Sequence, residues 1–303
     1  MAAIVVEALR KRYGTVDAVS DVSFEVEAGE VFALLGPNGA GKTTTVEILE
    51  GFRRRDAGEV SVLGLDPGNR AAQQRLRVRI GVVLQELAVE PFLTVREVLT
   101  RSAGFYPAPR PVDDVLQLIG LEDKAGSRVK TLSGGQQRRL DLGLGIVGRP
   151  EVIFMDEPTT GFDPSARRGA WEVVRQLTRG GATVLLTTHY MDEAEALANR
   201  VAVIANGRIV AAGPPATLGG RDVGEVTIRF RMPDGVVPAD LPTASVSISG
   251  DVVTIRTGEE VRVLHELTGW AMERRFELAG LTVNRLTLEE VYLRLTGQTE
   301  AGA

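Results

Sequence analysis

The chain has 303 residues, of which 44% are hydrophobic, and its formal net charge is −5 at pH 7. This length predicts one large domain or two ordinary ones, and the hydrophobic content is ample for a sizeable core. The absence of cysteine excludes disulfides, zinc–thiolate sites and thiol chemistry. The acidic balance gives no sign of nucleic-acid binding, and no apolar stretch approaches the roughly 18–20 residues that cross a bilayer. The N-terminus lacks the basic-then-apolar layout of a signal peptide, so we expect a cytoplasmic protein whose membrane role would need a partner chain.

The first 35 residues have the pattern of strands. Residues 4–9 and 22–26 suit half-buried strands, and the continuous apolar run 31–35 is typical of a buried one. The polar residues 10–14 predict a loop between the first two strands. The ring of Tyr13 in that loop could stack on a base, or it could simply pack against the protein.

The residues that follow the buried strand match the phosphate-loop pattern G-x-x-x-x-G-K-[ST]. They are Gly36, Pro37, Asn38, Gly39, Ala40, Gly41, Lys42 and Thr43, and a helix is predicted from Thr44. Glycines allow successive backbone N–H groups to converge on a phosphate, and the helix N-terminus adds partial positive charge there. In such a loop the lysine reaches the β- and γ-phosphates and the threonine hydroxyl ligates magnesium.

A strand is predicted at 58–64, and the apolar run 80–84 predicts a second, buried strand that ends at Gln85. A glutamine just past a strand end can reach a metal-bound water or a phosphate oxygen. It can equally be an exposed loop residue.

Residues 86–150 read as a mostly helical insertion into an α/β body. Thr94 and Glu97 have the spacing of a capping box, and 112–119 predicts another short helix. The insertion ends with a helix capped by Ser133, behind which Gly134 and Gly135 leave N–H groups bare, as at a second anion-binding helix end. The alternative is an ordinary capped helix, although each glycine weakens it by about 1 kcal/mol relative to alanine.

Polar side chains follow two further buried strands. The run 152–155 ends in Asp156, placed to bind magnesium, and Glu157, placed to polarise an attacking water as general base. Asp163 is an exposed acid in the turn before a predicted helix at 165–178. His189 stands at the end of strand 182–188, where its ring could hydrogen-bond a phosphate or could be structural.

Glycines and prolines at 213–220 mark a linker to a small α+β domain of about 80 residues. Strands are predicted at 226–232, 246–248, 252–255 and 281–285, and helices at 258–277 and 288–295. This domain carries no catalytic pattern.

Together these motifs resemble the nucleotide-binding subunit of ATP-binding-cassette (ABC) transporters over about residues 3–218. The phosphate loop looks like the Walker A motif, and residues 152–157 look like the Walker B motif. Gln85 corresponds to the Q-loop and His189 to the switch histidine. Residues 132–136 resemble the signature motif, and residues 162–163 resemble the D-loop. Tyr13 lies where the family has its adenine-stacking aromatic residue. Phe162 departs from the usual leucine of the D-loop.

The resemblance implies an α/β fold: a P-loop NTPase core with an antiparallel β subdomain and a helical subdomain at about 86–150. The ATPase domain would span 1–218, and a C-terminal accessory α+β domain would span 219–303. The cofactors would be ATP and Mg²⁺. Catalytic roles fall to Glu157, His189 and Gln85, and metal binding to Thr43, Gln85 and Asp156. ATP contacts fall to Tyr13, Gly36, Pro37, Asn38, Gly39, Ala40, Gly41, Lys42, Thr43, Thr44, Ser133, Gly134, Gly135, Gln136 and Asp163.

In this family two subunits pair head to tail, so that Ser133 and its glycines cap the γ-phosphate held by the partner copy. A separate permease in the membrane would keep the protein on the inner face of the cell membrane, with no nucleic acid involved. Residues 188–195 and 288–293 look like the drug-exporter and antibiotic-resistance (ABC-2 type) branch. The alternatives are a soluble ATPase of the same family with a non-transport role, and a regulatory protein with ATP as a structural ligand.

Overall fold

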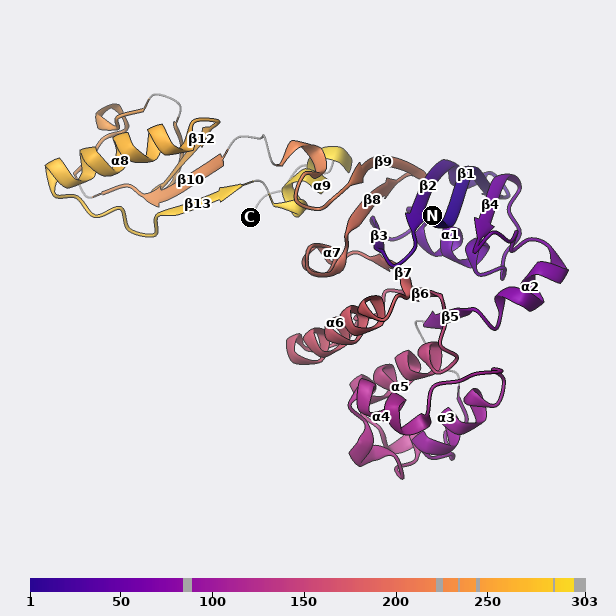
Figure 1. Ribbon diagram of the computed structural model, residues 1–303. Helices are drawn as coiled ribbons and strands as arrows, with labels where there is room; N and C mark the ends of the chain where they lie inside the picture. The colour runs from indigo at the N-terminus through magenta and orange to yellow at the C-terminus, as the bar shows by residue number, and fades with distance from the viewer. Residues whose placement is uncertain (84–88, 222–225, 234, 244–245, 286, 297–303) are drawn as a thin grey trace. The chain divides into compact units, whose positions relative to one another are not determined.

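The computed structural model describes residues 1–83, 89–221, 226–233, 235–243, 246–285 and 287–296. It divides into two compact units, Met1–Pro215 and Ala216–Ala303 (Figure 1). Gln85 lies outside the described residues.

A six-stranded sheet in the order β5-β6-β7-β3-β8-β9 forms the body of the first unit. Neighbouring strands from β5 to β8 are parallel, and β9 is antiparallel to β8. The carboxyl ends of β3, β6 and β7 therefore meet at one edge, where open α/β sheets bind their ligands. The strands are β3 (Val31–Leu35), β5 (Ile80–Val83), β6 (Val152–Asp156), β7 (Thr183–Thr188), β8 (Arg200–Ala205) and β9 (Arg208–Gly213).

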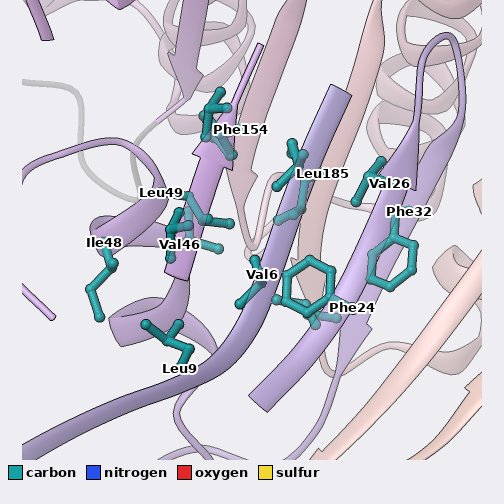
Figure 2. Close-up of a cluster of buried hydrophobic side chains, with 14 of the residues drawn as sticks. Val6, Leu9, Phe24, Val26, Phe32, Val46, Ile48, Leu49, Phe154 and Leu185 are labelled. Carbon is teal, nitrogen blue, oxygen red and sulfur yellow. The ribbon is translucent and has the colours of Figure 1, made fainter. Parts of the chain in front are cut away.

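A second, antiparallel sheet has the order β2-β1-β4, with β1 (Ala2–Tyr13), β2 (Val16–Glu27) and β4 (Ala57–Val62). Helix α1 (Lys42–Leu49) shares one apolar core with both sheets, as Figure 2 shows. Val46, Ile48 and Leu49 of α1 are at most 1% exposed, and the rings of Phe24 and Phe32 stack at 5.1 Å. This burial anchors α1, and with it the loop that precedes the helix.

One local prediction was wrong, and one helix was missed. The predicted loop at 10–14 is a strand up to Tyr13. A β-bulge with Ala8 at φ 48° lets β1 continue, and Lys11 near the charged end of the strand pairs with Asp56. A helix not predicted, α2 (Arg70–Leu76), begins at Asn69, whose side chain accepts hydrogen bonds from two backbone N–H groups.

The insertion is helical, as predicted, with α3 (Val95–Ala103), α4 (Val112–Ile119) and α5 (Gly134–Ile146). Helix α5 lies directly against β5: a Cβ added at Gly81 would come within 2.0 Å of the carbonyl oxygen of Gly145. Helices α6 (Pro164–Arg179) and α7 (Met191–Leu197) follow β6 and β7 respectively.

The second unit has a four-stranded antiparallel sheet in the order β11-β12-β10-β13. Its helix α8 (Glu260–Arg274) buries Val263 and Leu267 in a core shared with β10 and β12. The other elements are β10 (Val226–Arg231), β11 (Val246–Ser249), β12 (Val252–Thr257), β13 (Thr282–Arg285) and α9 (Leu288–Thr296). The architecture agrees with the predicted fold class. Among the described residues, no helix combines the length and the apolar character that crossing a bilayer requires.

Candidate active site

The phosphate loop joins β3 to α1 in a conformation that only glycine allows at Gly41. Gly41 has φ +103°, and a Cβ there would lie 2.3 Å from the carbonyl oxygen of Ala18 in β2. Gly39 also has positive φ. Because the N-cap Gly41 has no side chain, the first N–H groups of α1 remain available to an anion, as they do in nucleotide-binding loops.

The Lys42 side chain is folded back onto this loop. Its Nζ donates to the carbonyl oxygens of Gly36 at 2.7 Å and Pro37 at 3.2 Å, and lies 3.7 Å from Oε1 of Glu157. Lys42 is 4% exposed. Burial lowers the pKa of the Lys42 ammonium, while the carboxylates of Glu157 and Asp156 act in the opposite direction.

Two hydroxyls hold Asp156 at the carboxyl end of β6. Thr43 Oγ1 donates to Oδ2 of Asp156 at 3.1 Å, and Thr187 Oγ1 donates to Oδ1 from the neighbouring strand β7. A hydroxyl oxygen and a carboxylate this close beside a phosphate loop are the hard oxygen donors that Mg²⁺ prefers. The residues present therefore fit the predicted metal.

Glu157 follows β6 with φ +48°, a left-handed conformation unusual for a residue other than glycine. Its N–H donates to both the carbonyl and the hydroxyl oxygen of Thr187, each at 3.1 Å. Its Oε1 lies 3.2 Å from Nδ1 of His189, and Thr160 donates to its Oε2 at 3.2 Å. The turn thus aims the carboxylate at Lys42 and His189, so three predicted site residues converge.

The signature residues form a separate, local cluster at the start of α5. Ser133 and Gln136 make a reciprocal capping box: the Ser133 N–H donates to Gln136 at 3.0 Å and its hydroxyl accepts from the Gln136 N–H at 3.3 Å. Cβ atoms added at Gly134 and Gly135 would meet nothing within 4 Å. The hydrogen bonds between Ser133 and Gln136 are thus local to the start of α5, a helix that Figure 1 shows in another part of the first unit than α1.

The remaining predicted residues have local contacts of their own. Asp163 caps α6 by accepting from the N–H groups of Ser165 at 2.8 Å and Ala166 at 2.9 Å. The Tyr13 ring is 39% exposed, with the Arg53 guanidinium 5.2 Å from its centroid. Asn38 is exposed, and Pro37 and Thr44 are half-buried.

Sequence reasoning missed two residues that hold the acids in place. Thr187 could have been suspected from its position at the end of a strand that pairs with β6, opposite Asp156. Arg138 of α5 could not, because it bonds backbone carbonyl oxygens: Asp156 at 3.2 Å, Glu157 at 2.9 Å and Pro158 at 3.1 Å.

Sequence comparison finds relatives over nearly the whole chain. The profile of the family described as ABC transporter matches residues 19–160, and that of an ABC transporter domain-containing protein-like C-terminal domain matches 226–287. The chain is 42% identical to the Nod factor export ATP-binding protein I of Paraburkholderia xenovorans, covering 98% of each chain. It is 35% identical to the linearmycin resistance ATP-binding protein LnrL of Bacillus subtilis, covering 97% of this chain and 98% of the relative. It is 37% identical to the daunorubicin resistance ATP-binding protein DrrA3 of Streptomyces coeruleorubidus, covering 97% and 96%.

Solved structures share the fold of the first unit. An ATP-binding subunit of an ABC transporter is 27% identical with a TM-score of 0.65, covering 71% of this chain and 90% of that one. A dimeric post-hydrolysis ATP-binding cassette bound to ADP and Pi has a TM-score of 0.63 at 23% identity, covering 70% of this chain and 98% of that one. At this identity the likeness supports the fold and nothing more. With relatives of this identity over its full length, the chain belongs to the ATP-hydrolysing, ATP-binding subunits of ABC transporters, in the branch that contains the export and antibiotic-resistance proteins.

Proposed function

We propose that this subunit hydrolyses ATP with Glu157 as general base and energises the export of a hydrophobic small molecule through a separate permease. The observation that carries the catalytic part is the position of Oε1 of Glu157, 3.7 Å from the Lys42 ammonium and 3.2 Å from His189. A carboxylate beside the phosphate-binding lysine can accept the proton of a water that attacks the terminal phosphate.

Each group of the site has a role in this reaction. Lys42 exchanges its loop carbonyl oxygens for phosphate oxygens and stabilises the charge that develops in the transition state. Thr43 and Asp156 hold Mg²⁺, which supplies further positive charge at the phosphates. His189 donates a hydrogen bond at the γ-phosphate, and Tyr13 stacks on the adenine.

The turn at Ser133 supports a head-to-tail dimer of two copies. Its hydroxyl accepts from the Gln136 N–H, which leaves the hydroxyl hydrogen to donate to an anionic oxygen. Gly134 and Gly135 face open space in their own chain, so nothing there requires glycine. An approaching triphosphate held by the partner copy would require it, since a side chain would block the N–H groups.

The cargo and the permease are inferred from the relatives. Their names state Nod factor export, linearmycin resistance and daunorubicin resistance, and the similarity includes the second unit, residues 226–287. A drug-like or other hydrophobic small molecule is the cargo class we propose. The permease would hold this subunit at the inner face of the membrane.

The variant Glu157→Gln tests the catalytic proposal. We expect ATP hydrolysis to fall at least about 100-fold, because removing a general base costs this much, while ATP binding persists. The variant should form an ATP-dependent dimer, measured by light scattering after size exclusion. Glu151→Gln is the matched control, since Glu151 precedes the same strand and pairs with Arg79 outside the site. Hydrolysis at the parent rate by Glu157→Gln would show that Glu157 is not the general base. An ATP-loaded variant that stays monomeric would contradict the proposed dimer.

A further inference from the structure

The guanidinium of Arg138 holds the turn that carries Glu157. It donates to the carbonyl oxygens of three successive residues, Asp156 at 3.2 Å, Glu157 at 2.9 Å and Pro158 at 3.1 Å. The Arg138 side chain is only 10% exposed, and Asp141, one turn further along α5, accepts from its Nη1 at 3.0 Å. One side chain of α5 thus fixes the peptide groups on both sides of Glu157.

This grip matters because Glu157 has a left-handed backbone with φ +48°. That conformation is sparsely populated for residues with a Cβ, and it persists only where the surroundings impose it. Arg138 holds the carbonyl side of the turn, and Thr187 holds the N–H of Glu157. If the peptides relaxed to a right-handed conformation, the carboxylate would swing away from Lys42 and His189.

Arginine suits this task because its guanidinium is planar, always charged, and carries five donors in a fixed fork. Bonds from a charged donor to carbonyl oxygens are stronger than bonds between neutral groups. Asp141 neutralises the buried charge and fixes the direction of the fork, so its role is to orient Arg138.

We infer that Arg138 is a positioning residue that makes the alignment of the general base Glu157 depend on the position of helix α5. The inference rests on the proposed function, in which Ser133 at the start of α5 contacts the ATP bound to the partner copy. The same helix would then contact one ATP through its N-cap, Ser133, and govern hydrolysis of the other through Arg138. Closure on the partner's ATP would align this subunit's own base.

Single variants test the positioning role. We expect Arg138→Met to lower kcat about 10- to 100-fold, because small misplacements of a catalytic group cost this much, and to leave the Kd for ATP within about twofold. Arg138→Lys should recover part of kcat, since an ammonium can donate to carbonyl oxygens without the fork geometry. Arg175→Met is the matched control: Arg175 also donates to a backbone carbonyl, that of Ala196 at 3.2 Å, outside the site.

The split between kcat and Kd separates positioning from stability. Equal losses for the Arg138 and Arg175 variants, or a kcat for Arg138→Met at the parent value, would overturn the inference. If Arg138→Met does not fold, Arg138→Lys carries the same comparison, with melting temperature as the measure of folding.

Mixed dimers decide which of the two sites Arg138 serves. Differently tagged copies are co-purified in two arrangements: Arg138→Met opposite Glu157→Gln, and a copy with both substitutions opposite the parent chain. If Arg138 aligns its own subunit's base, the first dimer has no working site and the second retains one. If Arg138 acts instead through Ser133 on the partner's ATP, the first dimer retains a working site and the second has none.

Hydrolysis by the second dimer alone supports the inference, and hydrolysis by the first alone, or equally by both, overturns it. Failure of the proposed dimer has a different signature. In that case Glu157→Gln would form no ATP-dependent dimer with any copy. The effect of Arg138→Met on kcat would still test whether Arg138 positions Glu157.

Discussion

The clearest test of the electrostatics around the site is the substitution Glu50→Gln. Glu50 follows α1, and burial, the negative charge of Asp156 and that of Glu47 raise its pKa from the ordinary 4.5 to about 8. The neutral carboxyl is therefore the form that the folded protein holds near pH 7. Glutamine keeps the shape and the neutrality of that form.

The sign of the effect follows from the two pKa values. In the unfolded chain Glu50 loses its proton near pH 4.5, whereas in the folded protein it keeps the proton until about pH 8. Stability is therefore full below pH 4.5 and falls as the pH rises through this window, by about 1.4 kcal/mol per pH unit. Relative to the parent, Glu50→Gln should gain about 2.5 kcal/mol in unfolding free energy between about pH 5 and about pH 7.

The assay must report on the first unit alone and must be free of metal. The chain has two tryptophans, Trp171 on α6 in the first unit and Trp270 on α8 in the second. In a Trp270→Phe background with EDTA, Trp171 fluorescence during urea unfolding gives the free energy at each pH. Titrating groups that do not interact with Glu50 cancel in the difference between variant and parent. A difference that does not change with pH would mean that Glu50 is ionised in the folded protein, and would refute the reasoning.

Three further predictions follow from the geometry. Gly41→Ala should abolish ATP binding and lower the unfolding free energy by about 2–4 kcal/mol, because it adds a clash with a backbone oxygen to the strain of positive φ. Gly14→Ala, where φ is positive but the surrounding space is open, should lower it by about 1 kcal/mol and leave ATP binding unchanged. Titration with a fluorescent nucleotide measures the binding, and urea unfolding measures the stability. Thr187→Val should cost about 1–3 kcal/mol and lower kcat about tenfold, because Asp156 and a backbone N–H lose a partner; an unchanged kcat would contradict this support of the acids. A chain that ends at Pro215 should bind ATP with an unchanged Kd by calorimetry, because every described site residue precedes that point; lost binding would show that the second unit completes the site.

The phosphate loop could be predicted from sequence because its conformation is a local property. A glycine-rich loop between an apolar strand and a helix specifies its own conformation, and Gly41 adopts it. The rule that ligands bind at the carboxyl ends of parallel strands was enough to expect Asp156 and His189 at one edge of the sheet.

The two places where the sequence-based prediction failed also have local physical causes. The charged end of β1 looked like a loop because charged side chains are rare in buried strands, yet here Arg10 and Arg12 are exposed and Lys11 is paired with Asp56. Helix α2 was missed although Asn69 is a good N-cap, because only seven residues follow in the helix and its one buried residue is Leu76.

The sequence alone therefore determined the nucleotide-binding motifs, the fold class and the family, since each depends on contiguous residues. Only the tertiary structure decided how the general base is held. Arg138 bonds carbonyl oxygens, which every residue possesses, so no side-chain pattern marks its partners. The proton on Glu50 likewise depends on its burial in the folded protein and on the charge of Asp156, which is distant in the chain and comes near only when the chain folds.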